Sequence, residues 1–168
     1  PLEAPARRGR LQAALGLDDE AEAQLDAGIL LLESQRLQLR DARLQAAFFD
    51  RGASLFDEMA AFQTEKRHDA SRALFFVERG RARQLLDALH SPSAASLAGA
   101  RPVEPNGARP REPQELQRGL PAGIALVYYE CLPDRLLSWV VTREEIHFGG
   151  QALDREDLRR EVAAYQAA

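Results

Sequence analysis

The hydrophobic period of this chain changes across a proline-rich stretch. Up to Leu89 the apolar residues recur every three or four positions, which is typical of helices that bury one face. Five of the nine prolines fall between Ser91 and Pro113, where they disfavour both helix and sheet. From Ile124 to Phe148 short apolar runs with a two-residue period alternate with turn residues, as in β-strands. The sequence therefore predicts an α+β fold, with antiparallel helical hairpins first and a small antiparallel sheet after them.

Three long helices are expected in the first part of the chain. Asp18 or Asp19 caps the first, Asp41 begins the second, and Asp69 caps the third. Only a helical turn is expected before Gly16, which acts as its stop. The helices are joined by short polar turns and carry apolar residues on more than one face. This pattern predicts stacked helical hairpins that resemble degenerate tetratricopeptide (TPR) repeats.

The third helix is expected to connect the two parts of the chain. Gly52 and Gly80 lie inside predicted helices, where glycine costs about 1 kcal/mol relative to alanine. We therefore expect a neighbouring helix to approach closely at each of them. The helix over Asp69–Leu89 has apolar residues on several faces. It is expected to cover the preceding hairpin with one face and the sheet with another, so that both share one core.

The second part is expected to contain three strands and one helix. The strands are bounded by turn residues and cover Ile124–Tyr129, Leu136–Thr142 and Ile146–Phe148. Gly149 and Gly150 are expected to end the last strand, and Asp154 to begin the helix. The chain then divides into a TPR-like helical segment (1–90), a proline-rich linker or mobile loop (91–119) and a segment with the β-hairpin and a helix (120–168). A short helical turn over Gln114–Arg118 is expected inside the linker, with Pro113 at its first position.

Charge and composition narrow the classes of partner. The sequence has 22 Lys and Arg against 26 Asp and Glu, which gives a net charge of −4. No segment is strongly basic, so a nucleic-acid partner is not expected. The apolar runs are far shorter than the ~20 residues of a membrane helix, so no membrane partner is expected either. The single cysteine, Cys131, cannot form an internal disulfide and fits a reducing, cytoplasmic location.

Few residues are candidates for chemistry. Cys131 ends an apolar strand without a neighbouring base, so it is interpreted as structural. The three histidines, His68, His90 and His147, have neither metal-ligand spacing nor a second cysteine beside them. The arginines of Glu78–Arg83 are interpreted as a solvated helix face, with Glu78 paired to a nearby arginine. The sequence thus predicts no catalytic residue, no cofactor-binding residue and no metal site.

Two stretches of sequence carry a resemblance to a known family. They are ERGRARQLLDAL (Glu78–Leu89) and, after the proline-rich gap, LPAGIALVYYECLPDRLLSWVVTREEIHF (Leu120–Phe148). Their order and spacing resemble the junction at which TPR helices precede a CHAT domain, the caspase-like peptidase module of bacterial TPR proteins. The resemblance implies a parent protein with an upstream array that senses a protein or peptide partner and a downstream cysteine peptidase.

The motifs that would carry peptidase activity in that family are absent from the 168 residues. The family's catalytic His lies in a His-Gly stretch and its catalytic Cys in a Ser-Ala-Cys-type stretch, whereas His147 is followed by Phe148. Neither role is therefore transferred to this chain. The resemblance implies a non-catalytic coupling segment, which could also form a homo-oligomer through unpaired strand edges. The alternative is a stand-alone TPR-like scaffold that binds a peptide or protein, and an intact enzyme ranks third.

Overall fold

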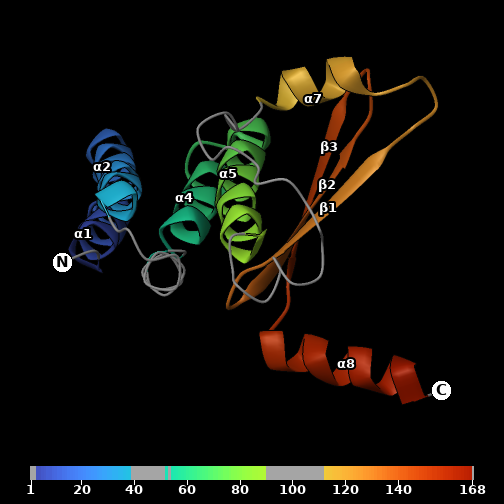
Figure 1. Cartoon of the computed structure of the whole chain (residues 1–168). Helices are drawn as coiled ribbons and strands as arrows, with labels where there is room; N and C mark the ends of the chain where they lie inside the picture. Colours follow the sequence, from blue (N-terminus) through green and yellow to red (C-terminus); the bar gives the residue numbers. More distant parts are fainter. Residues whose placement is uncertain (1–2, 39–51, 53, 90–111, 168) are drawn as a thin grey trace. The chain divides into compact units, whose positions relative to one another are not determined.

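A computed structural model describes residues 3–38, 52, 54–89 and 112–167. Its backbone divides into two compact units, Pro1–Arg111 and Glu112–Ala168 (Figure 1). The described part of the first unit is helical, and the second unit contains a three-stranded antiparallel sheet with helices. The α+β fold expected from the sequence is confirmed. The proline-rich stretch lies outside the described residues as far as residue 111.

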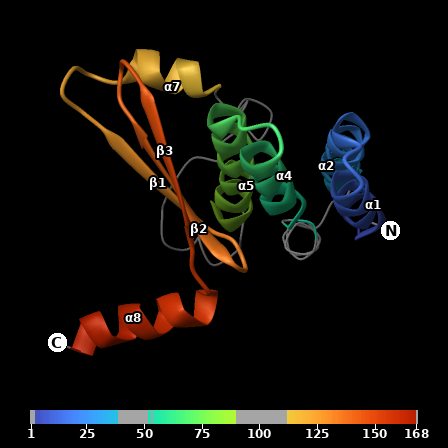
Figure 2. The ribbon, with the colours of Figure 1, turned by 180° about the vertical axis from the view of Figure 1, so that it is seen from behind.

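The first unit is built from two helical hairpins (Figures 1 and 2). Its described helices are α1 (Glu3–Ala14), α2 (Asp18–Gln38), α4 (Ser54–Glu65) and α5 (Ala70–Leu89). α1 packs along α2 and α4 packs along α5, while α2 also contacts α4 and so joins the hairpins. α4 is the C-terminal part of the helix predicted to start at Asp41; residues 39–51 lie outside the described residues.

The first helix differs from the expectation. The sequence predicted only a helical turn before Gly16, whereas α1 has 12 residues. Ala6 and Gly9 are buried against α2, with an added Cβ on Gly9 only 2.8 Å from Leu25 Cγ. Packing on a neighbour stabilises a segment whose own helix propensity is modest. Gly16 ends the turn with φ 75°, as expected of a glycine stop.

The caps are partly as predicted. The Arg72 N–H donates to Asp69 Oδ1 at 2.8 Å, so Asp69 caps α5. α2 instead begins at Asp18, so both Asp18 and Asp19 lie in its first turn rather than before it. Their charges still lie at the positive end of the helix, where they are favourable.

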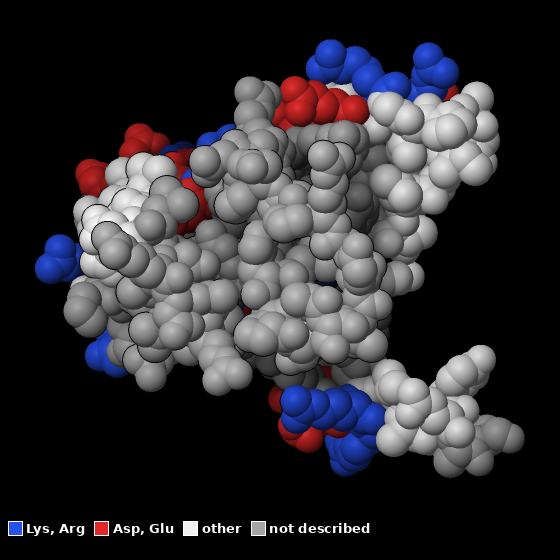
Figure 3. All heavy atoms as spheres, viewed as in Figure 1, with Lys and Arg blue, Asp and Glu red and all other residues white. Residues whose placement is uncertain are grey.

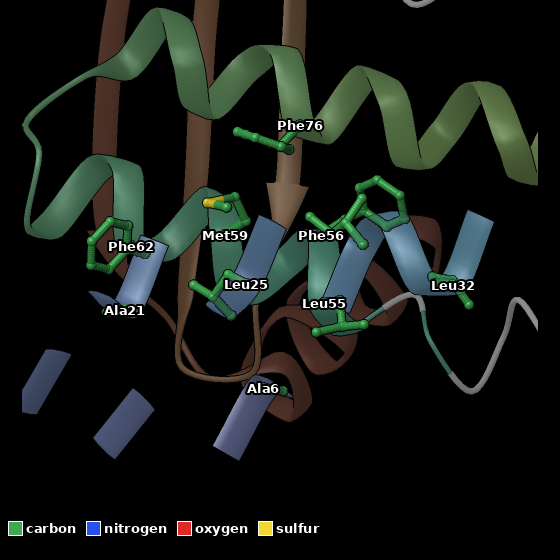
Figure 4. Close-up of a cluster of buried hydrophobic side chains, with 10 residues drawn as sticks. Ala6, Ala21, Leu25, Leu32, Leu55, Phe56, Met59, Phe62 and Phe76 are labelled. Atoms are coloured by element: carbon green, nitrogen blue, oxygen red, sulfur yellow. The ribbon is translucent and has the colours of Figure 1, made fainter. Parts of the chain in front are cut away.

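One hydrophobic core spans the four described helices of the first unit (Figure 4). Its members are almost fully buried and are Ala6, Ala21, Leu25, Ile29, Leu32, Leu55, Phe56, Met59, Phe62 and Phe76. Burial of a large apolar side chain contributes about 1.5–3 kcal/mol. In Figure 4 Met59 and Phe56 of α4 lie between Phe76 of α5 and the α2 side chains Leu25 and Leu32. The two hairpins are therefore held together by shared burial around α4.

Close helix approach at glycine is confirmed at both predicted positions. A Cβ on Gly52 would clash with Leu32 Cδ1, and one on Gly80 would lie 3.3 Å from Phe56 Cγ. Gly28 of α2 is a third such position, where a Cβ would lie 2.8 Å from Pro5 Cβ and 3.1 Å from a Leu55 methyl carbon. These contacts explain why residues of poor helix propensity occupy helix interiors.

Gly28→Val is expected to lower the free energy of unfolding by about 1–3 kcal/mol, because the new side chain must displace Pro5 or Leu55 in a packed core. Thermal unfolding followed by circular dichroism measures the loss. Ala27→Val is the matched control, since Ala27 is exposed on the same helix and only the small difference in helix propensity applies. Equal losses in the two variants would contradict a close crossing at Gly28.

The second unit contains α7 (Pro113–Gly119), β1 (Leu126–Cys131), β2 (Arg135–Val141), β3 (Ile146–Ala152) and α8 (Arg155–Ala167). The strands follow each other in the order β1-β2-β3, and both pairings are antiparallel. Pro113 begins α7 as predicted. The Glu156 N–H donates to Asp154 Oδ1 at 2.7 Å, so the predicted start of the last helix is confirmed.

The prediction that Gly149 and Gly150 end the sheet is wrong. β3 continues through them to Ala152, with Gly149 opposite Ser138 and Gly150 opposite Leu137. β2 is long enough to supply partners along this whole length. The Phe148 ring also lies over Gly150, where a Cβ would be 3.7 Å from Phe148 Cζ, so an aromatic ring covers the bare backbone. Neighbouring strands thus override the weak strand preference of glycine.

The two faces of the sheet differ in exposure. Leu137, Trp139 and Val141 share one face and are buried, as their spacing predicts, and the Trp139 and Phe148 ring centroids are 5.4 Å apart. On the other face Val127 and Tyr129 are 52% and 55% exposed. The shared core of helix Asp69–Leu89 with this sheet stays a prediction.

Candidate interaction surfaces

A polar seam joins the two hairpins of the first unit. Glu22 of α2 accepts a hydrogen bond from Gln63 Nε2 at 2.8 Å and another from Arg67 Nε at 2.8 Å. Arg67 also donates to Asp19 at 2.6 Å. One acidic side of α2 is therefore tied to the end of α4 and the turn that follows it.

The second half of this seam is a partly buried ion pair. Arg79 of α5 donates two hydrogen bonds to the Glu33 carboxylate, at 2.9 and 2.5 Å, and both side chains are less than one-fifth exposed. The string Glu78–Arg83 was interpreted as a solvated face with Glu78 as the arginine partner. For Arg79 the solvated position was wrong, because its side chain is only 16% exposed and pairs with Glu33, 46 residues away on α2. A bidentate pair fixes orientation as well as distance, so it sets the rotation of α2 against α5.

Asp26 and Arg72 lie between the two ends of the seam. Burial raises the pKa of Asp26, and the nearby charges of Arg72 and Arg79 partly oppose that rise. The Arg72 guanidinium lies over the Phe75 and Phe76 rings, 5.3 and 5.0 Å from their centroids. Arginine stacked on an aromatic ring keeps its charge while it covers apolar surface. The seam therefore continues along α2 between its two ends.

The α1–α2 hairpin also exposes apolar side chains. Leu11 of α1 and Leu15, which directly follows α1, are 62% and 67% exposed, and Leu30 of α2 is 60% exposed. Leu11 and Leu15 are four residues apart and therefore share one helical face. Along α2 the exposed positions Ala23, Ala27, Leu30, Leu31 and Ser34 carry no charge. We call these exposed residues of α1 and α2 the outer hairpin face.

The opposite charges of α8 gather in its first half. The helix carries Arg155, Arg159 and Arg160 beside Glu156, Asp157 and Glu161, and its second half has no charged residue. Figure 3 shows acidic and basic side chains of described residues together near the start of α8. Two arginines pair with acids three residues earlier, Arg159 with Glu156 and Arg160 with Asp157. Such paired charges do not form the one-sided field that a nucleic acid would need.

The residues considered for chemistry do not come together. Cys131 is half-buried at the end of β1, and His147 lies in β3 with its Nε2 3.0 Å from Glu145 Oε1. Through the strand register, Cys131 lies opposite Leu136, which lies opposite Gln151, four residues beyond His147. This places the two residues roughly 13 Å apart along the strands and ~10 Å apart across them. A nucleophile and its base must approach to about 3 Å.

His68 lies in the exposed turn between α4 and α5 with φ 54°, and His90 lies outside the described residues. Among the described residues no group of three or more His, Cys, Asp or Glu side chains could hold a metal ion. No described helix is long and apolar enough to cross a membrane. Comparison with protein-family models, with curated proteins and with solved structures gave no match.

Proposed function

We propose that this chain is a non-catalytic coupling and protein-interaction segment of a bacterial TPR-CHAT protein. It links a partner-sensing helical array to a caspase-like cysteine peptidase module further along the parent chain, and it acts in the cytoplasm. The outer hairpin face carries this proposal. A hairpin with exposed leucines on both of its helices is what a helical array presents to its next repeat or to a bound peptide.

The polar seam supplies the route for coupling. A partner that binds α1 and α2 moves or holds that hairpin, and the pairs Arg67–Glu22 and Arg79–Glu33 make the second hairpin follow. α5 is the last described helix of the first unit. The bidentate Arg79–Glu33 pair favours one relative position of α2 and α5, so it opposes sliding of one hairpin past the other.

The alternative function is a stand-alone TPR-like scaffold that binds a peptide or protein through the same outer hairpin face. The two proposals differ in what the gene encodes after Ala168. A His-Gly segment followed by a Cys among small residues supports the coupling segment of a peptidase. A reading frame that ends without them supports the scaffold.

The chain itself is expected to have no peptidase activity, because its sequence lacks the His-Gly and Ser-Ala-Cys-type stretches of the family it resembles. A peptidyl chloromethyl ketone should label Cys131 no faster than it labels free cysteine at the same pH. Mass spectrometry after timed quenching measures the rate, with Cys131→Ser as the unlabelled control. That substitution should change the melting temperature little. Labelling faster than free cysteine would refute the proposal that this chain lacks a nucleophile.

A further inference from the structure

We propose that β3 is a self-complementary edge that pairs with β3 of a second copy of this chain, giving a continuous six-stranded antiparallel sheet. Among the described strands, β3 pairs with β2 alone and lies at one edge of the sheet (Figure 1). Six of its seven residues are exposed. This surface is separate from the outer hairpin face, so the proposal does not depend on the coupling function.

The backbone of β3 offers hydrogen-bonding groups at the free edge. The Thr142 N–H donates to Glu145 O at 2.9 Å, and the Leu153 N–H donates to Asp134 O at 3.2 Å. These two bonds fix the phase of the ladder, in which the odd-numbered residues of β3 bond to β2. Groups of the even-numbered residues then point outward, because bonded positions alternate along an antiparallel strand. These outward-pointing N–H and C=O groups belong to Ile146, Phe148, Gly150 and Ala152.

β3 also lacks the features that keep edge strands apart. The sequence IHFGGQA contains no Asp, Glu, Lys, Arg or Pro. Natural edge strands usually carry such a charge or proline, because an unprotected edge attracts another strand. Its length, about 23 Å at 3.3 Å per residue, is enough for a specific register.

The sequence of β3 points to a second copy as the partner. With a two-fold axis at Gly149, all four outward-pointing residues meet outward-pointing residues: Ile146 faces Ala152 of the second copy, and Phe148 faces its Gly150. Each Phe148 ring, 40% exposed now, would cover a glycine and lie diagonally beside its counterpart. This register pairs the whole strand, whereas any slipped register leaves outward groups unpaired. A strand interface of this size is small, so the dimer should be weak and depend on concentration.

Sedimentation over a series of concentrations tests the pairing. The weight-average mass should rise from 18.6 kDa toward twice that value. In Gly149→Lys the two lysines lie opposite each other at the axis, with their Cα atoms about 4.5 Å apart. Repulsion between their ammonium groups should then abolish the dimer. Gly149→Glu should lose it for the same reason. A mixture of the two should regain it, because opposite charges then meet.

Two controls separate pairing from unfolding. Ala163→Lys adds the same charge at an exposed position of α8 and should leave dimerisation unchanged. Circular dichroism and Trp139 fluorescence show whether each Gly149 variant keeps its fold, since an added Cβ lies 3.0 Å from Ser138 Oγ. A chain that stays monomeric, a Gly149→Lys variant that still dimerises, or a folded mixture that does not associate would each overturn the proposal.

Hydrogen exchange of the unmodified chain gives a second test that needs no variant. With rising concentration, exchange should slow at the amides of Phe148, Gly150 and Ala152, which point to the free edge. It should not slow further at His147 and Gly149, which already bond to β2. Equal slowing at odd and even positions would contradict pairing through this edge.

Discussion

Phe76→Ala is expected to lower the free energy of unfolding by about 3–5 kcal/mol, the range for removing an aromatic ring from a core. The Phe76 side chain is fully buried in the core of the first unit, beside Phe75 with ring centroids 5.3 Å apart. Phe76→Ala would also remove one of the two rings that the Arg72 guanidinium covers. Little can move in to fill the space, because four helices converge on this core.

Chemical denaturation followed with two probes measures this effect and tests the shared core. Far-UV circular dichroism reports the helices, and Trp139, the single tryptophan, reports the sheet of the second unit. If helices and sheet unfold as one unit, Phe76→Ala shifts both curves together. Leu30→Ala, at an exposed position of α2, is the control and should shift neither appreciably. A shift of the helical curve alone would show that the units fold independently.

Leu137→Ala is expected to lower the free energy of unfolding by about 2–5 kcal/mol. Leu137 is 2% exposed in the middle strand, between Glu130 of β1 and Gly150 of β3. It belongs to the buried face that also carries Trp139, so its removal leaves a cavity where the sheet has least freedom to close. The same two probes apply, and Trp139 fluorescence should respond first.

Val127→Ala is the matched control for the sheet, because Val127 is 52% exposed on the opposite face. Val127→Ala should lower the free energy of unfolding much less than Leu137→Ala does. If both variants lost the same stability, the assignment of the buried face would be wrong. If Leu137→Ala shifted the fluorescence curve alone, a signal from the helical array could not pass through a common core with the sheet.

Much of the local structure could be predicted from the sequence, because short-range chemistry determines it. The three- and four-residue period gave the helices, Asp69 and Asp154 gave two helix starts, and the two-residue period placed Leu137, Trp139 and Val141 on one face. Gly52 and Gly80 predicted close helix crossings, since nothing else favours glycine inside a helix. The missing His-Gly and Cys motifs are also a property of the sequence itself.

Other features depend on partners that are remote along the chain. α1 extends beyond the predicted turn because α2 covers it, and β3 runs through Gly149 and Gly150 because β2 lies alongside and Phe148 covers the second glycine. Arg79 meets Glu33 of another helix rather than the nearby Glu78. The period of a sequence determines which face of an element is apolar. Only the tertiary structure decides what meets that face, because the energy of packing and ion pairing depends on neighbours that local sequence does not name.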